Sequence, residues 1–240
     1  MVNRVFVTGD THGRFDRIQK WCEEQGDLTV DDVLIILGDA GINYYQNNKD
    51  VELKRLISRL PITLVCVHGN HEERPENCSG YKLEYVDELC CECWIQDEFP
   101  NIMFPKDGKM TINGTKFLIA GGASSIDKQL RLLYGWHWFE SEQMTDQEMD
   151  RVREIVKEDP VYDYVLTHTC PTKFEPKHLY LKGVEQSRVD KRMERFLDEI
   201  EETVQYRRWL FGHFHSDGEI NDRATLCFSK IDQLLGVEQG

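Results

Sequence analysis

Five short polar segments of this sequence are rich in aspartate, histidine and asparagine, and each follows directly after an apolar run. Oxygen and imidazole donors without thiolate suit divalent transition metals such as Mn, Fe or Zn. The candidate metal ligands in these segments are Asp10, His12, Asp39, Asn70, His168, His213 and His215. This set exceeds what one ion needs, so it predicts a site for two ions about 3.5 to 4 Å apart, bridged by a carboxylate.

Such segments need a scaffold that brings residues far apart in the sequence to one place. Short β-branched runs alternate with runs of helical periodicity, a pattern typical of a largely parallel sheet covered by helices. We expect strands over residues 4–7, 33–37, 62–67, 162–166 and 209–211, and helices over 15–24, 50–60, 144–157 and 189–204. Because ligands of open α/β sheets bind beyond the carboxyl ends of the strands, the five segments are expected to converge.

The middle of the sequence differs, with short apolar runs at residues 94–95, 102–104, 110–112 and 116–120. The dipeptides Asp107-Gly108 and Asn113-Gly114 are typical of hairpin turns and predict antiparallel strands here. No linker or change of composition divides the chain. We therefore expect one α/β domain over residues 1–240.

Taken in order, the polar segments resemble the motifs of calcineurin-like metallophosphoesterases. That family carries Asp-x-His, Gly-Asp, Gly-Asn-His-Glu/Asp, a later His and Gly-His-x-His. The matching residues here are Asp10 and His12, Gly38 and Asp39, Gly69 to Glu72, His168, and Gly212, His213 and His215. The resemblance implies a four-layer α/β/β/α sandwich of two mixed sheets flanked by helices.

The resemblance also implies a role for each matching residue. One ion would take Asp10, His12, Asp39 and His215, and the other would take Asp39, Asn70, His168 and His213. The ions, with Mn favoured over Fe or Zn, would hold a bridging hydroxide that attacks phosphorus in line. His71 would stay unligated near the leaving group, where its imidazolium is the candidate general acid. The implied reaction is hydrolysis of a phosphomonoester or phosphodiester whose substrate is small or nucleotide-like.

The sequence departs from one branch of that family, the protein serine/threonine phosphatases, just after Asp39. Ile42 replaces the carboxylate that orients the histidine in those enzymes, and Asn43 replaces their phosphate-binding arginine. Both differences argue against a protein phosphatase. They also leave the partner of His71 unassigned.

Other residues are candidates for contact with the substrate. Lys128 or Arg131, which follow a glycine-rich turn, could approach the substrate phosphate, the alternative being a solvated helix start. His68 is a further candidate contact, or a plain loop residue. The aromatic run at residues 135–140 would form either a wall for a base or sugar, or part of the core.

Composition narrows the choice of partners. The 43 acidic and 29 basic residues leave a formal net charge of -14, which disfavours an extended nucleic-acid groove and hence a nuclease. We see no signal peptide and no apolar run near the roughly 20 residues of a membrane span, so we expect a cytoplasmic protein without membrane contact. A small phosphorylated substrate fits an acidic chain whose site holds cations. A non-catalytic metal-binding scaffold is the alternative from another class.

Overall fold

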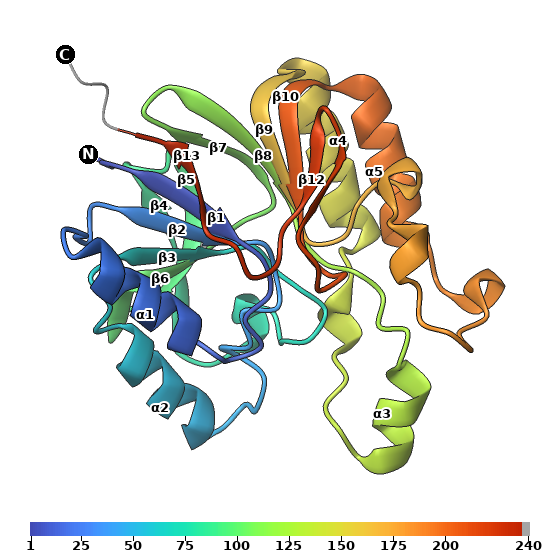
Figure 1. Ribbon diagram of the computed structural model, residues 1–240, viewed down its shortest axis with the longest axis horizontal. Helices are drawn as coiled ribbons and strands as arrows, with labels where there is room; N and C mark the ends of the chain where they lie inside the picture. The colour runs from blue at the N-terminus through green and yellow to red at the C-terminus, as the bar shows by residue number, and fades with distance from the viewer. Residues whose placement is uncertain (237–240) are drawn as a thin grey trace.

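The computed structural model describes residues 1–236 of the chain. Two mixed β-sheets face each other, and helices lie on the outer side of each sheet (Figure 1). Helices α1 (Asp16–Gln25) and α2 (Asn48–Ile57) cover the first sheet, whereas α4 (Asp146–Glu158) and α5 (Arg192–Thr203) cover the second. The predicted four-layer α/β/β/α sandwich is confirmed.

The first sheet has seven strands in the order β13-β1-β2-β3-β6-β5-β4. Its strands are β1 (Val5–Thr8), β2 (Val33–Ile36), β3 (Thr63–Cys66), β4 (Tyr81–Val86), β5 (Cys91–Gln96), β6 (Phe99–Pro105) and β13 (Asp232–Leu235). Strands β1, β2 and β3 pair in parallel, so their carboxyl ends meet at the same edge of the sheet.

The second sheet has six strands in the order β11-β12-β10-β9-β8-β7. Its strands are β7 (Gly108–Ile112), β8 (Thr115–Ala120), β9 (Val161–Thr167), β10 (Gln205–Phe211), β11 (Gly218–Asn221) and β12 (Ala224–Leu226). Strands β8, β9 and β10 are parallel, and this aligns the ends of β9 and β10.

Alternation along the strands builds three apolar layers. In β2, Ile35 belongs to the core between the two sheets, whereas Leu34 belongs to the core beneath α1 and α2. In β10, Leu210 faces the first sheet, and Trp209 and Phe211 belong to the core beneath α4 and α5. Each of these side chains is at most 4% exposed. The central layer fixes one sheet against the other, so both can contribute to a single site.

The helices begin and end where local chemistry favours it. Thr145 caps α4 by accepting a hydrogen bond from the backbone N–H of Glu148, whose side chain accepts one from Thr145 in return. Gly26 ends α1 in the left-handed conformation, with φ of 71°. Within residues 1–236, no helix combines the length and the apolar character needed to cross a bilayer.

One of the two predicted hairpins is present and the other is wrong. Asn113 and Gly114 join β7 to β8 with φ of 49° and 81°, as a tight hairpin requires. Asp107-Gly108 instead connects β6 of the first sheet to β7 of the second. The Asp107 carboxylate is buried, where it accepts a hydrogen bond from Gly121 N at 2.7 Å and pairs with Arg74 at 3.3 Å. Asp107 therefore connects the segment between β6 and β7 to the loops that carry Arg74 and Gly121.

Candidate metal centre

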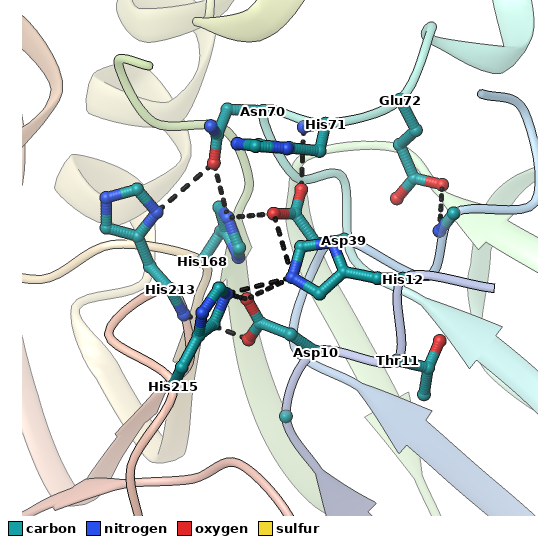
Figure 2. A network of polar contacts seen from close by, with 12 residues as sticks. Asp10, Thr11, His12, Asp39, Asn70, His71, Glu72, His168, His213 and His215 are labelled. Atoms are coloured by element: carbon teal, nitrogen blue, oxygen red, sulfur yellow. Dashed lines mark hydrogen bonds and ion pairs between the residues drawn. The ribbon is translucent and has the colours of Figure 1, made fainter. Parts of the chain in front are cut away.

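Five loops converge where the two sheets meet, three from the first sheet and two from the second (Figure 2). They follow β1, β2, β3, β9 and β10 and carry, in that order, Asp10 and His12; Asp39; Asn70; His168; and His213 and His215. The convergence follows from the topology, because parallel strands place their carboxyl ends together.

The first group of donors comprises Asp10, His12, Asp39 and His215, whose ligand atoms all lie within 4.8 Å of one another. His215 Nε2 lies 3.2 Å from Asp10 Oδ2 and 2.8 Å from His12 Nε2. His12 Nε2 is in turn 3.9 Å from Asp39 Oδ2. Two carboxylate oxygens and two imidazole nitrogens therefore point toward one small space (Figure 2).

This donor group fits a divalent cation. The Oδ2 atom of Asp10 is buried, and among the described residues it faces His215 Nε2 at 3.2 Å without a well-aligned hydrogen bond. An unpaired buried carboxylate oxygen costs free energy unless a cation or a donor satisfies it. The facing nitrogens of His12 and His215 present lone pairs that a shared cation would also satisfy.

A second group of donors lies on the other side of Asp39. Asn70 Oδ1 is 2.8 Å from His168 Nε2 and 3.1 Å from His213 Nδ1. His168 Nε2 is also 3.5 Å from Asp39 Oδ2. One carboxylate oxygen of Asp39 thus faces ligand atoms of both groups (Figure 2).

Hydrogen bonds outside the centre orient the second group. Asn70 donates from its side-chain nitrogen to Ser125 Oγ at 2.8 Å, which turns Oδ1 toward the histidines. His168 Nδ1 lies 2.8 Å from the carbonyl oxygen of Leu37, so it carries a hydrogen that it donates. This contact leaves Nε2 of His168 to face the centre, as a metal-binding imidazole requires.

Each carboxylate is also held by the backbone of a neighbouring loop. His213 N donates to Asp10 Oδ1 at 2.9 Å, and His71 N donates to Asp39 Oδ1 at 2.7 Å. In both residues the other carboxylate oxygen, Oδ2, faces the donor groups and remains available to a cation. Left-handed backbone, uncommon for residues other than glycine, recurs at His12, Asp39, His213 and His215. Strain of this kind persists only where the surroundings enforce it, and it gathers at functional sites.

Two glycines allow the loops to pack this closely. A Cβ atom at Gly38 would lie 2.1 Å from His168 Nδ1, and one at Gly69 would lie 2.1 Å from the Asp39 backbone nitrogen. Gly38 also has a φ of +90°, a conformation that side chains rarely adopt. Any larger residue at either position would displace a candidate ligand.

The centre attracts positive charge. Burial opposes ionisation of Asp39, but the His168 imidazole outweighs it and holds the pKa of Asp39 well below its usual range. Burial lowers the pKa of His168, yet Asp39 outweighs it and raises that pKa to about 9. Burial, followed by the charge on His168, lowers the pKa of His213 to about 3. A proton bound at His168 thus takes the position where a cation would neutralise Asp39.

Glu72 supports the centre, although the sequence assigned it no role beyond its place in a motif. Its carboxylate accepts hydrogen bonds from the backbone N–H groups of Ala40, Gly41 and Ile42 at 3.1, 3.1 and 3.4 Å. Burial, with the charge of Asp39 added, raises the pKa of Glu72 to about 8. Glu72 thereby fixes the loop that presents Asp39.

The side chain of His71 lies beside the donors, and its partner is a guanidinium group. Arg131, in the short helix α3 (Lys128–Tyr134), places Nη2 2.6 Å from His71 Nδ1. Asp127 pairs with Arg131 Nε at 2.8 Å and keeps it in position. Burial lowers the pKa of His71. The charge of Asp39 raises that pKa in part, but Arg131 lowers it, so the pKa of His71 lies below its usual range. The contact places a donor against Nδ1 of His71, which leaves Nε2 as the ring nitrogen that can carry a hydrogen; the role of His71 as general acid stays a prediction.

The other two predicted substrate contacts, Lys128 and His68, have partners within the protein. Lys128 Nζ lies over the ring of Trp138, 3.6 Å from its centroid. His68 is buried, and its Nε2 contacts the carbonyl oxygen of Ser141 at 3.2 Å. His68 also lines a small cavity with Arg74, and its contact with the substrate stays a prediction.

Two facing sheets that bring carboxylates, imidazoles and an amide to one shared end define an α/β protein with a candidate metal site. The sequence matches the family described as calcineurin-like phosphoesterase over residues 3–217. The chain therefore belongs to the calcineurin-like phosphoesterase family. No curated protein matches the sequence.

Solved structures are similar to this chain at low sequence identity. One structure aligns with a TM-score of 0.52 at 14% identity, over 95% of this chain and 90% of that chain. The protein TT1561 of Thermus thermophilus aligns with a TM-score of 0.48 at 13% identity, over 97% of this chain and 98% of that chain. The phosphopantetheinyl hydrolase PptH of Mycobacterium tuberculosis aligns with a TM-score of 0.44 at 14% identity, over 100% and 98%.

Proposed function

We propose that this protein is a metal-dependent phosphoesterase that hydrolyses a small, nucleotide-like phosphomonoester or phosphodiester with two divalent cations. The observation that carries the proposal is the position of Asp39. Its Oδ2 atom lies 3.9 Å from His12 Nε2 in one donor group and 3.5 Å from His168 Nε2 in the other. A carboxylate shared by two donor groups is the arrangement that a two-cation site needs.

The two donor groups divide the ligands between the cations. Asp10, His12, Asp39 and His215 would hold one ion, and Asp39, Asn70, His168 and His213 would hold the other. Oxygen and imidazole donors favour Mn, with Fe or Zn as alternatives. When bound, such cations supply a nucleophile at neutral pH and offset the charge of the phosphoryl group.

The residues around the donors would position the substrate. His71, kept neutral by its neighbours, would donate its Nε2–H to an oxygen of the phosphate or of the leaving group. Arg131 lies against His71 and adds a positive charge at the edge of the centre. The contact at 2.6 Å makes Arg131 a positioning residue for His71.

The net charge of the chain supports a small substrate, and its shared core supports a single domain. With a formal net charge of -14, the chain attracts a phosphate only where cations or isolated basic residues invert the local potential. The core shared by the two sheets supports one domain for the described residues. All eight cysteines are free thiols, which supports the proposal of a reducing compartment such as the cytoplasm.

The test is hydrolysis of p-nitrophenyl phosphate and bis-p-nitrophenyl phosphate side by side, with and without Mn. The proposal predicts Mn-dependent turnover of at least one of them, and the ratio assigns monoester or diester preference. Metal content measured on the same samples gives a readout independent of turnover. Protein that binds Mn but hydrolyses neither ester would refute the phosphoesterase proposal and favour the non-catalytic scaffold.

A further inference from the structure

A cavity of about 510 Å³ opens beside the metal centre, and no candidate metal ligand except His12 borders it. Its lining residues are His12, Gly13, Arg14, Gly41, Tyr44, Tyr45, Lys49, Leu53 and His71. The volume lies within the range typical of sites for small molecules. His71 lines both this cavity and a second one that borders the donors, so a group that leaves on the His71 side of the reacting phosphorus has access to either, and the charges of the two cavities decide between them.

Aromatic rings form one wall of the cavity. The rings of Tyr44 and Tyr45 meet edge to face, with centroids 5.0 Å apart. The imidazole of His137 contacts both of them, with centroids 5.3 and 6.4 Å away. Tyr45 is 42% exposed, so its ring is accessible to a planar ligand. Such a wall favours an aromatic group over an aliphatic one.

Two basic residues of the cavity have no acidic partner within the described residues. Neither Arg14 nor Lys49 takes part in an ion pair there, although many of the chain's other basic residues do. Lys49 Nζ lies 4.5 Å from the centroid of the Tyr45 ring. The Tyr45 ring can stack on an aromatic ring of a ligand, and the unpaired Lys49 amine can attract an anionic group of the same ligand. In a chain with formal net charge -14, such an unpaired basic residue is a local positive site.

A second cavity, of about 260 Å³, borders the donors directly: Asp39, Asn70, His213 and His215 line it, as does His71. It also has a lysine near an aromatic ring, since Lys191 Nζ lies 5.5 Å from the centroid of the Tyr180 ring. The amine of Lys191, which also lines it, is already paired with Glu175 at 2.5 Å. Of these two cavities, the first alone therefore offers an anionic leaving group a lysine or arginine that has no acidic partner among residues 1–236.

We infer that the cavity of Arg14, Tyr44, Tyr45 and Lys49 binds a leaving group that carries both an aromatic ring and a negative charge. This inference rests on the proposed function and extends it from phosphate esters to a phosphoanhydride bond, which the same attack of water on phosphorus would cleave. A nucleoside monophosphate has that chemistry, so the substrate class is the nucleoside diphosphates. Water oxygen bonds to the terminal phosphorus while the bond from that phosphorus to the bridging oxygen breaks. The products are inorganic phosphate and a nucleoside monophosphate, and the excess water proton goes to solvent.

The experiment compares kcat/KM for ADP with kcat/KM for glycerol 2-phosphate, which has neither a ring nor a second phosphate. Wild-type protein with Mn is expected to prefer ADP at least tenfold. Lys49→Met is expected to lower that preference roughly tenfold, since it removes the charged donor that would bind the anionic group of the leaving nucleotide. Lys157→Met removes the same charge from an exposed position of α4 and should keep the wild-type preference.

A binding arm separates this inference from the proposed function. AMP, the leaving group itself, is titrated by calorimetry into wild-type, Lys49→Met and Tyr45→Leu proteins, with thermal melts to show that the variants fold. Weaker AMP binding by both variants supports the subsite even if no ester is hydrolysed, in which case the proposed function alone fails. Ester hydrolysis without preference for ADP, together with equal AMP binding by all three proteins, would overturn the subsite and leave the proposed function standing.

Discussion

The five loops of the metal centre and the segment that carries α3 reach the same place by different means. The loops are tied to each other by hydrogen bonds, and three of their candidate ligands, Asp10, Asp39 and His168, are at most 2% exposed. Helix α3 instead lies apart from both sheets (Figure 1) and leaves Leu133 74% exposed. It reaches the centre through Arg131, which contacts His71. The metal ligands are thus part of the fold itself, whereas the group that positions His71 is supplied by an appended segment.

The largest expected effect follows from removing the shared carboxylate. Asp39→Asn keeps the shape of the side chain but removes the charge that faces both donor groups. We expect loss of both metal ions and a fall in kcat on the order of 10³-fold, since cations contribute several kcal/mol to such reactions. Metal content by mass spectrometry and turnover of p-nitrophenyl esters measure the two effects. Asp97→Asn, at an exposed position, is the control.

Unchanged metal stoichiometry in Asp39→Asn would contradict the shared role. Loss of only part of the bound metal would instead assign Asp39 to one group alone. Either result would show that the two donor groups are independent sites, and not one centre built by both sheets.

Metal removal tests whether the loops depend on cations for their order. A ligand that binds the folded state alone stabilises it by about 2.7 kcal/mol at a concentration one hundred times its Kd. We expect Mn to raise the free energy of unfolding of chelator-treated wild-type protein by about that amount, measured by urea denaturation. Asp39→Asn should gain much less. A wild-type protein equally stable with and without Mn would mean that the buried Asp10 Oδ2 is satisfied in some other way.

Arg131→Met tests the appended segment. The substitution removes the donor to His71 Nδ1 and lets the ring turn, while it touches none of the candidate ligands. We expect kcat to fall ten- to a hundredfold, roughly the effect of losing a partner that orients a functional side chain, with metal content unchanged. Lys128→Met, which removes a neighbouring charge stacked on Trp138, should change kcat less than twofold. Loss of metal in Arg131→Met would show that α3 belongs to the centre after all.

The same contrast explains which features the sequence could predict. Each candidate ligand follows a strand, and the ends of parallel strands converge, so local patterns at Asp10, Asp39 and His168 were enough to predict one site. The central strands were predicted for the same reason, because a short apolar, β-branched run such as 33–37 is a local property of the sequence. These predictions needed no knowledge of distant contacts.

The rest depends on contacts between distant residues. Arg131 is 60 positions from His71 in the sequence, and nothing local to either residue indicates their contact. Asp107-Gly108 reads as a hairpin because turn propensity does not reveal that β6 and β7 belong to different sheets. Tyr44 and Lys49 line a cavity with His12 and His71 only after the loops have folded. Glu72 had a signal, its place three residues after Gly69, but its three backbone partners are about 30 positions away.

The smallest expected effect concerns the outer face of α3. Leu133→Ala removes an apolar side chain that is already 74% exposed, and alanine favours helix, so we expect the free energy of unfolding to change by less than about 0.5 kcal/mol. Leu34→Ala, the same substitution at a fully buried position of β2, should cost about 2 to 5 kcal/mol. Urea denaturation of both variants gives the comparison directly. A loss above about 1 kcal/mol for Leu133→Ala, especially one that depends on protein concentration, would mean that this face is covered in solution by a second copy of the chain. Helix α3 would then be a buried element like the metal-centre loops, and the contrast between them would fail.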